Sequence, residues 1–266
     1  MRLGATGSSA RPPEHSWSPI VELRQYTLRP GRRDVLIDLF DSELVEPQEE
    51  TGMKVIGQFR DLDDPDKFVW FRGFRDMPER ARALSDFYGG PVWRFHSKEA
   101  NATMVDVDDV LLLRPAQPDS AFTLEVKRTP RSLPGSGPGF VQATIMQLEV
   151  PAEETGIISF FERAIAPAVS DCGGSILGYF VTESAENTFP SLPVRAGEEV
   201  FVWCAGFATR ETLERVSDDD SEARLTAAQA PALTRPPHVL RLAPTSRSLL
   251  HGHSRACCAV AHDPEP

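Results

Sequence analysis

Aromatic and polar residues in the first half of the chain have the chemistry to bind a small polar or anionic molecule. Tyr26, Gln58 and Arg72 each occur in a short segment of alternating pattern, and each offers a hydrogen-bonding group. Trp70 lies two residues before Arg72, and residues two apart in a strand share one face. These side chains either line a ligand cavity, with Trp70 supplying apolar contact, or are hydrogen-bonded residues that bridge two sheets of the fold, because buried polar groups need partners with or without a ligand.

Residues 87–96 form a second candidate site. Two adjacent glycines let the backbone turn tightly, and the proline that follows them suits the first position of a helix. We expect this rigid turn to form the lip of a pocket and to fix the directions of three side chains: Trp93, Arg94 and His96. His96 is either a catalytic or haem-binding residue or, with no second ligand beside it, an ordinary hydrogen-bonding residue.

The sequence lacks the familiar motifs for phosphate and metal binding. Gly89 and Gly90 do not stand in the GxxxxGK[ST] frame of a phosphate loop. The aspartates of residues 61–66 have neither the glycine nor the downstream glutamate of a calcium loop, so we interpret them as a solvated turn. The cysteines show neither CxxC spacing nor a histidine cluster; they are Cys172, Cys204, Cys257 and Cys258. We therefore expect no metal, no cofactor and no disulfide framework.

Composition argues against two further classes of partner. The formal net charge of −11 repels nucleic-acid phosphates and anionic lipid, so we expect no nucleic-acid partner. No apolar run approaches the ~18 residues of a membrane span, and the first residues lack the apolar core of a secretory signal. These features predict a cytoplasmic protein with no membrane span.

The chain contains an internal repeat: residues 21–114 have a degenerate copy at residues 142–242. Two stretches carry the alignment, residues 52–59 on residues 173–180 and residues 68–74 on residues 201–207. The second stretch aligns only with an insertion of about a dozen residues after Val181. The period is far too long for a solenoid unit, so each copy is predicted to be a small domain.

Each copy is predicted to contain strand, helix, strand, strand, helix and strand. In the first copy, turn residues bound the strands at residues 20–28, 54–60 and 67–74, and an apolar stripe after the first strand predicts a helix. The run from Phe68 to Phe71 is apolar on both alternating faces, so both sides of the sheet must be covered. Helices cover one side, and the sheet of the second copy meets the other. The sequence therefore predicts an α+β fold in which one chain builds a barrel that is usually made by a dimer.

Turn-rich segments without periodicity set the predicted boundaries. We expect a disordered leader at residues 1–19, a first domain at 20–116, a linker at 131–139, a second domain at 140–244 and a disordered tail at 245–266. The sequence leaves open whether the protein is a monomer with an internal pseudo-dimer or a homodimer.

The first copy resembles the NIPSNAP family of dimeric α/β-barrel proteins. The matching segments are residues 22–31, 46–48, 57–60, 68–74 and 87–93. The second copy is similar only in pattern, with Gln147 in the place of Tyr26 and Ala205 in the place of Arg72. The resemblance implies two tandem ferredoxin-like βαββαβ units, in a superfamily that includes cofactor-independent monooxygenases, haem-degrading enzymes and chlorite dismutase-like proteins. It implies no particular catalytic residue.

Two functions are predicted. The preferred one is a NIPSNAP-type barrel that binds a small molecule or a protein through its inner cavity. The alternative is a cofactor-independent monooxygenase or haem-related enzyme in which Tyr26, Arg72, Trp93 or His96 orients an aromatic substrate. Because the second copy lacks the polar residues of the first, we expect a ligand to contact the first copy more than the second.

Overall fold

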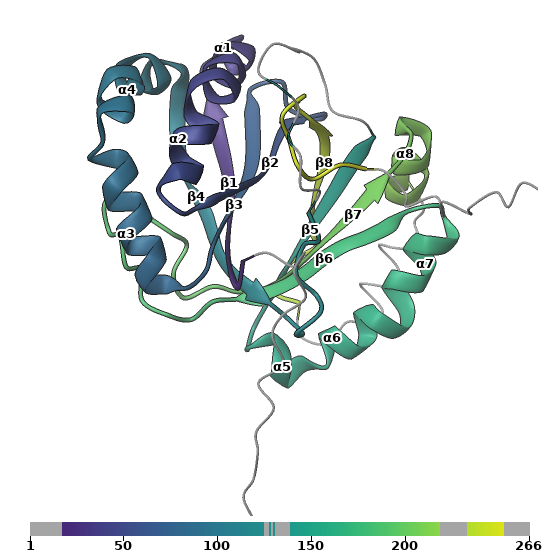
Figure 1. Ribbon diagram of the computed structural model, residues 1–266. Helices are drawn as coiled ribbons and strands as arrows, with labels where there is room; N and C mark the ends of the chain where they lie inside the picture. Colours follow the sequence, from purple (N-terminus) through teal and green to yellow (C-terminus); the bar gives the residue numbers. More distant parts are fainter. Residues whose placement is uncertain (1–17, 125–127, 129, 131–138, 219–232, 253–266) are drawn as a thin grey trace, which may run out of the picture.

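The computed structural model describes residues 18–124, 128, 130, 139–218 and 233–252, and shows two successive units (Figure 1). The first unit consists of β1 (Ile20–Leu28), α1 (Arg33–Leu39), η1 (Phe40–Leu44), α2 (Val45–Glu50), β2 (Lys54–Asp61), β3 (Lys67–Phe74), α3 (Met77–Tyr88), α4 (Pro91–Thr103) and β4 (Met104–Pro115). The second unit consists of β5 (Phe140–Leu148), α5 (Ala152–Thr155), α6 (Ile157–Phe160), η2 (Phe161–Ile165), α7 (Ala166–Asp171), β6 (Ser175–Thr182), β7 (Glu199–Phe207), α8 (Arg210–Asp218) and β8 (His238–Pro244). Residues 1–17 of the predicted leader and residues 131–138 of the predicted linker lie outside the described residues.

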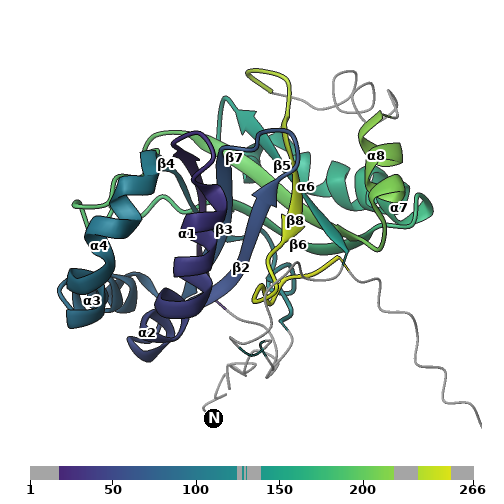
Figure 2. The same ribbon diagram turned by 90° about the horizontal axis from the view of Figure 1, so that it is seen from above.

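The eight strands close into one barrel in the order β1-β3-β2-β8-β5-β7-β6-β4. The two units join at two short antiparallel seams, where β2 pairs with β8 and β4 pairs with β6. The helices of the first unit cover one outer side of the barrel, and those of the second unit cover the opposite side (Figures 1 and 2). The prediction that one chain builds an α+β barrel from two βαββαβ units is confirmed.

Apolar side chains from all eight strands fill the barrel. Val21 and Leu23 of β1 point inward and are fully buried in this core. Because side chains alternate along a strand, Glu22, Arg24 and Tyr26 point outward, toward the helices. The prediction that Tyr26 lines a cavity inside the barrel is therefore wrong, since apolar side chains occupy the interior.

The chain continues to pack against the barrel after β8. Residues 245–250, which we call the C-terminal strap, run along β2, and two of their N–H groups donate to β2 carbonyls at N···O distances of 2.8 and 3.2 Å. Leu249 and Leu250 of the strap are buried in the barrel core. The prediction of a disordered tail is wrong for residues 245–252. A segment this short shows no periodic pattern in the sequence, and its contacts with the barrel hold it in place. Residues 253–266 lie outside the described residues.

An equivalent segment follows β4 in the first unit. Residues 116–124 run along β6, and Phe122 of this segment joins the same core. Both segments pass closely over a glycine. A Cβ atom on Gly57 would lie 3.1 Å from Leu250 Cβ, and a Cβ atom on Gly178 would lie 3.1 Å from Phe122 Cδ1. The internal repeat thus extends to the segments that cover the core.

Trp70 and Trp203 occupy equivalent positions on β3 and β7, and both are buried. We expect Trp70→Ala to lower the free energy of unfolding by roughly 3–5 kcal/mol, because it empties a large volume under the helices of the first unit. Chemical denaturation of the purified variant measures this loss. Trp93→Ala, at a half-buried position, serves as the control with a smaller loss. A loss for Trp70→Ala below about 1 kcal/mol would place the strand at an exposed edge.

The C-terminal strap should contribute to stability as a part of the core. We expect Leu250→Ala to cost about 2–5 kcal/mol of unfolding free energy, the usual range for truncating a buried leucine. Phe122→Ala, which truncates the equivalent segment of the first unit, should cost a comparable amount. An unchanged denaturation midpoint for Leu250→Ala would show that the strap does not hold the core.

Candidate functional site

Four charged residues lie fully buried between the first sheet and its helices. Glu22 and Arg24 share the outer face of β1, Arg72 is the cross-strand partner of Glu22 on β3, and Arg80 reaches them from α3. The Glu22 carboxylate accepts from Arg24 Nη1 at 2.7 Å, from Arg72 Nε at 2.7 Å and from Arg80 Nε at 2.6 Å. We call these four residues the arginine cluster.

The arginine cluster carries excess positive charge in a dry environment. Burial by itself raises the pKa of Glu22, but the charges of Arg72, Arg24 and Arg80 outweigh it and hold that pKa well below its ordinary value. Glu22 is therefore ionised at neutral pH, and its contribution to stability is lost only as the pH falls below the ordinary glutamate pKa. Three guanidiniums facing one carboxylate leave two positive charges uncompensated. Arg72 Nη2 and Arg80 Nη2 are buried and find no hydrogen-bond partner among the described residues.

Aromatic rings surround the guanidiniums. Arg72 Cζ lies 5.1 Å from the centre of the Trp70 ring, and Arg24 Cζ lies 5.4 Å from the centre of the Tyr26 ring. Tyr26 Oη accepts a hydrogen bond from Arg24 Nε at 3.1 Å, and burial raises the pKa of Tyr26, so this phenol stays neutral. The structure therefore brings the predicted residues Tyr26, Trp70 and Arg72 together, but under the helices instead of inside the barrel.

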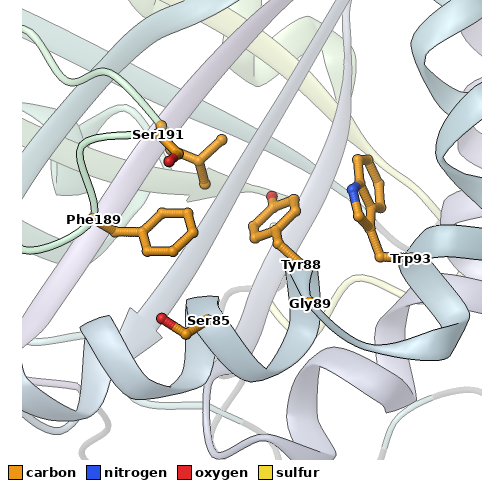
Figure 3. Close-up of a pocket in the computed structure, with 7 residues that line it drawn as sticks. Ser85, Tyr88, Gly89, Trp93, Phe189 and Ser191 are labelled. Carbon is orange, nitrogen blue, oxygen red and sulfur yellow. The ribbon is translucent and has the colours of Figure 1, made fainter.

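A pocket of about 540 Å³ opens beside this cluster (Figure 3). Its lining comes from α3, the turn before α4, α4 itself and the loop between β6 and β7: Ser85, Tyr88, Gly89, Trp93, Phe189, Ser191 and Leu192. The Tyr88 ring lies between the other two aromatic rings, with its centre 5.0 Å from that of Trp93 and 6.0 Å from that of Phe189. The predicted pocket residue Trp93 thus lies at a pocket wall.

Tyr88 and the β6–β7 loop separate the pocket from the arginine cluster. Arg72 Nη1 donates to Tyr88 Oη at 3.4 Å. Arg80 Nη1 donates to Asn187 Oδ1 at 2.9 Å and to Thr188 Oγ1 at 3.3 Å. Each contact joins a buried guanidinium to a residue that lines the pocket or adjoins its lining.

The β6–β7 loop is the insertion that the repeat alignment places after Val181. It leaves the second unit and lies against α3 and β4 of the first (Figure 1). The Arg195 backbone N–H donates to the Val110 carbonyl of β4 at 2.8 Å, and the Arg195 side chain pairs with Asp109 at 3.1 Å. Arg80 and Phe189 were not predicted as site residues, and Tyr88 was predicted only as a part of residues 87–96. The insertion after Val181 was visible in the sequence and could have pointed to Phe189. Where this loop packs, however, depends on how the barrel closes.

The turn before α4 forms as predicted. A Cβ atom on Gly89 would lie 2.8 Å from the Ser85 carbonyl oxygen, and one on Gly90 would lie 2.8 Å from that of Asp86, so both positions require glycine. Pro91 then begins α4.

Arg94 and His96 lie away from the aromatic pocket. Arg94 is exposed to solvent, so its predicted binding role has no support from its position. His96 stacks edge-on against Phe95 and lies in a second groove of about 410 Å³, lined by Glu43, Pro47, Pro91, Val92, Phe95 and His96.

Gln58, the remaining predicted site residue, belongs to a structural pair. Its Nε2 donates to Asp41 Oδ1 at 3.1 Å, which links β2 to η1. The equivalent Tyr179 on β6 donates to Glu162 Oε1 of η2 at 2.8 Å. The same strand-to-helix bond thus recurs in both units, and Gln58 does not line the aromatic pocket.

The second unit provides an internal comparison for the arginine cluster. The sheet pairing and the helix register place Gln142, Thr144, Ala205 and Leu213 at the positions of Glu22, Arg24, Arg72 and Arg80. All four are buried and uncharged. The pairing also corrects one alignment, since the counterpart of Tyr26 is Met146 and not Gln147. A sheet with its covering helices therefore forms in this fold without buried charge.

Neither a metal cluster nor a membrane-spanning helix occurs in the described part of the chain. Within it, no group of three or more histidine, cysteine or acidic side chains is arranged to hold a metal ion. None of the helices formed by these residues is long and apolar enough to cross a membrane.

Comparison with known proteins identifies the first unit. Residues 21–118 match the model of the NIPSNAP family. No curated protein matches the chain significantly. A putative monooxygenase from Fusobacterium nucleatum has a similar structure, with a TM-score of 0.51 and 9% identity over 89% of this chain and 97% of its own. An anthrone oxidase-like protein has a TM-score of 0.51 and 11% identity over 88% of this chain and 96% of its own.

Matches to single NIPSNAP domains cover a smaller part of the chain. A NIPSNAP family protein with unknown function from Agrobacterium tumefaciens has 19% identity and a TM-score of 0.35, over 39% of this chain and 92% of its own. The two long matches share the fold of the whole barrel, and the family match covers the unit that holds the arginine cluster and the pocket-lining residues of α3 and α4. The match to the NIPSNAP family model thus covers residues 21–118, which is less than half of this chain.

Proposed function

We propose that the protein binds a planar aromatic small molecule in the pocket between α3, α4 and the β6–β7 loop. The observation that carries this proposal is a row of three neighbouring aromatic rings, Phe189, Tyr88 and Trp93, all of which line the pocket. The volume of about 540 Å³ falls in the range of small-molecule sites, and such rings stack well on flat ligands. The proposed site replaces the barrel cavity expected from the sequence.

The joint construction of the pocket supports this proposal. Phe189, Ser191 and Leu192 come from an insertion that the first unit does not have, and the loop is tied to the first unit by Asn187 and Arg195. The second unit thus contributes a wall to a site centred on the first. This arrangement agrees with the expectation that a ligand contacts the first copy more than the second.

A cofactor-independent oxygenase acting in the same pocket is the second candidate. The fold similarity to a putative monooxygenase and to an anthrone oxidase-like protein suggests it. Among the described residues, however, the pocket lining contains no side chain that ordinarily titrates near neutral pH, and His96 lies in the second groove. This lining favours binding over proton abstraction. A haem-related enzyme would depend on His96, outside the proposed site.

Binding of two naphthalene probes tests the proposal. We expect 2-naphthoate or 2-naphthalenemethanol to bind with one-to-one stoichiometry in isothermal titration calorimetry and to quench Trp93 fluorescence. Phe189→Ala should weaken binding about ten-fold, because it removes one ring wall. Phe95→Ala is the matched control, since Phe95 is 81% exposed in the second groove.

Two outcomes contradict the proposal: neither probe binds, or Phe95→Ala weakens binding while Phe189→Ala does not. Oxygen consumption during incubation of the metal-free protein with a hydroxylated polycyclic aromatic distinguishes the oxygenase from the binding protein. Turnover that is lost in Phe189→Ala would assign oxygenation to the same pocket.

A further inference from the structure

Resting on the proposed function, we propose that the ligand of the aromatic pocket carries an anionic oxygen, which Tyr88 binds in front of the arginine cluster. The ligand class is a planar aromatic carboxylate or an ionised phenol.

The hydrogen bond between Arg72 and Tyr88 has a fixed direction. A guanidinium has only donors, so the phenol oxygen of Tyr88 must accept the bond from Arg72 Nη1. The hydroxyl proton of Tyr88 then remains available as a donor, and no acceptor for it occurs among the residues that the structure describes. Tyr88 lines the pocket, so we expect an oxygen of a bound ligand to accept this proton.

The charge behind Tyr88 favours an anion at that position. The arginine cluster has two uncompensated positive charges, and Arg72 Cζ lies 6.0 Å from the centre of the Tyr88 ring. Hydrogen bonds to ionised acceptors are stronger than bonds between neutral groups, and a buried charge is poorly screened by water. The unpartnered Nη2 atoms of Arg72 and Arg80 add to a positive potential that nothing among the described residues neutralises.

The second unit shows that the fold does not require this charge. Its equivalent positions are uncharged, as Gln142, Thr144, Ala205 and Leu213 are buried in the same register. Burying ions is costly, and well-packed neutral residues often serve stability equally well or better. The cluster occurs in the unit that contributes Tyr88 and Trp93 to the pocket, and Arg80 also holds Asn187 and Thr188 of the loop. These observations assign the cluster to ligand recognition.

Matched probes test the inference. We expect the wild-type protein to bind 2-naphthoate at least ten-fold more tightly than 2-naphthalenemethanol, a neutral molecule of similar shape, in calorimetry at pH 7.5 and low salt. Tyr88→Phe should weaken 2-naphthoate binding about ten-fold and leave 2-naphthalenemethanol binding within about two-fold, since the ring wall is kept while the hydroxyl, with its bond from Arg72, is lost. The dye 2,4-dinitro-1-naphthol, which is ionised at this pH, tells whether a phenolate takes the place of the carboxylate.

A graft of the second unit's residues onto the first removes the charge. The variant combines Glu22→Gln, Arg24→Thr, Arg72→Ala and Arg80→Leu, and we expect it to lose the preference for 2-naphthoate. If the graft variant still binds 2-naphthalenemethanol, its aromatic pocket is intact. If the graft variant does not fold, the loss of 2-naphthoate affinity in the isosteric Tyr88→Phe variant tests the inference instead. Equal affinity of the wild-type protein for the two probes overturns the inference and leaves the aromatic pocket in place. Absence of binding by every probe overturns the proposed function as well.

Discussion

The packing of the barrel interior determines where this protein can hold a ligand. Each unit presents a sheet whose two faces both carry apolar residues, and the inner faces are buried only when the two sheets close on each other. All eight strands, together with the C-terminal strap and residues 116–124, then fill the interior with side chains. Among the described residues the interior is filled with apolar side chains, and the buried charged groups of the first unit lie in the outer layer between its sheet and its helices, where we place the proposed ligand.

Within that outer layer the two units have diverged. Both keep the strand order, a π turn at equivalent positions, a buried tryptophan and the bond that ties β2 or β6 to the helix above it. The first unit adds buried charge, and the second adds a loop that reaches back to the first. One copy thus holds the charged group of the site, and the other completes its wall. A single chain can accommodate this asymmetry, whereas two identical subunits would carry both features twice.

Local patterns in the sequence predicted most of the fold. The repeat, the apolar run at Phe68 to Phe71 and the turn at Gly89 and Gly90 are features of short segments, and the structure confirms the barrel of two units and the turn before α4. For the first strand, the face that points into the barrel was predicted wrongly. Alternation shows which residues share a face, but only the closure of the barrel decides which face is inside.

The composition of the site depended on contacts between distant segments. Arg80 follows a good N-cap on an amphipathic helix, where a charged residue is ordinarily exposed, and only its bond to Glu22 of β1 explains its burial. Phe189 lies in an insertion whose length could be seen in the sequence. The sequence did not show that this insertion packs against the first unit. The C-terminal strap has the composition of a tail, and its pairing with β2 joins residues nearly 190 positions apart.

A crystal structure of the protein soaked with 2-naphthoate tests the central claim most directly, namely that the outer layer of the first unit is the ligand site. We predict that the naphthalene ring lies among Tyr88, Trp93 and Phe189 and that one carboxylate oxygen lies within hydrogen-bonding distance of Tyr88 Oη. A ligand inside the barrel, in the groove beside His96, or under the helices of the second unit would contradict this account.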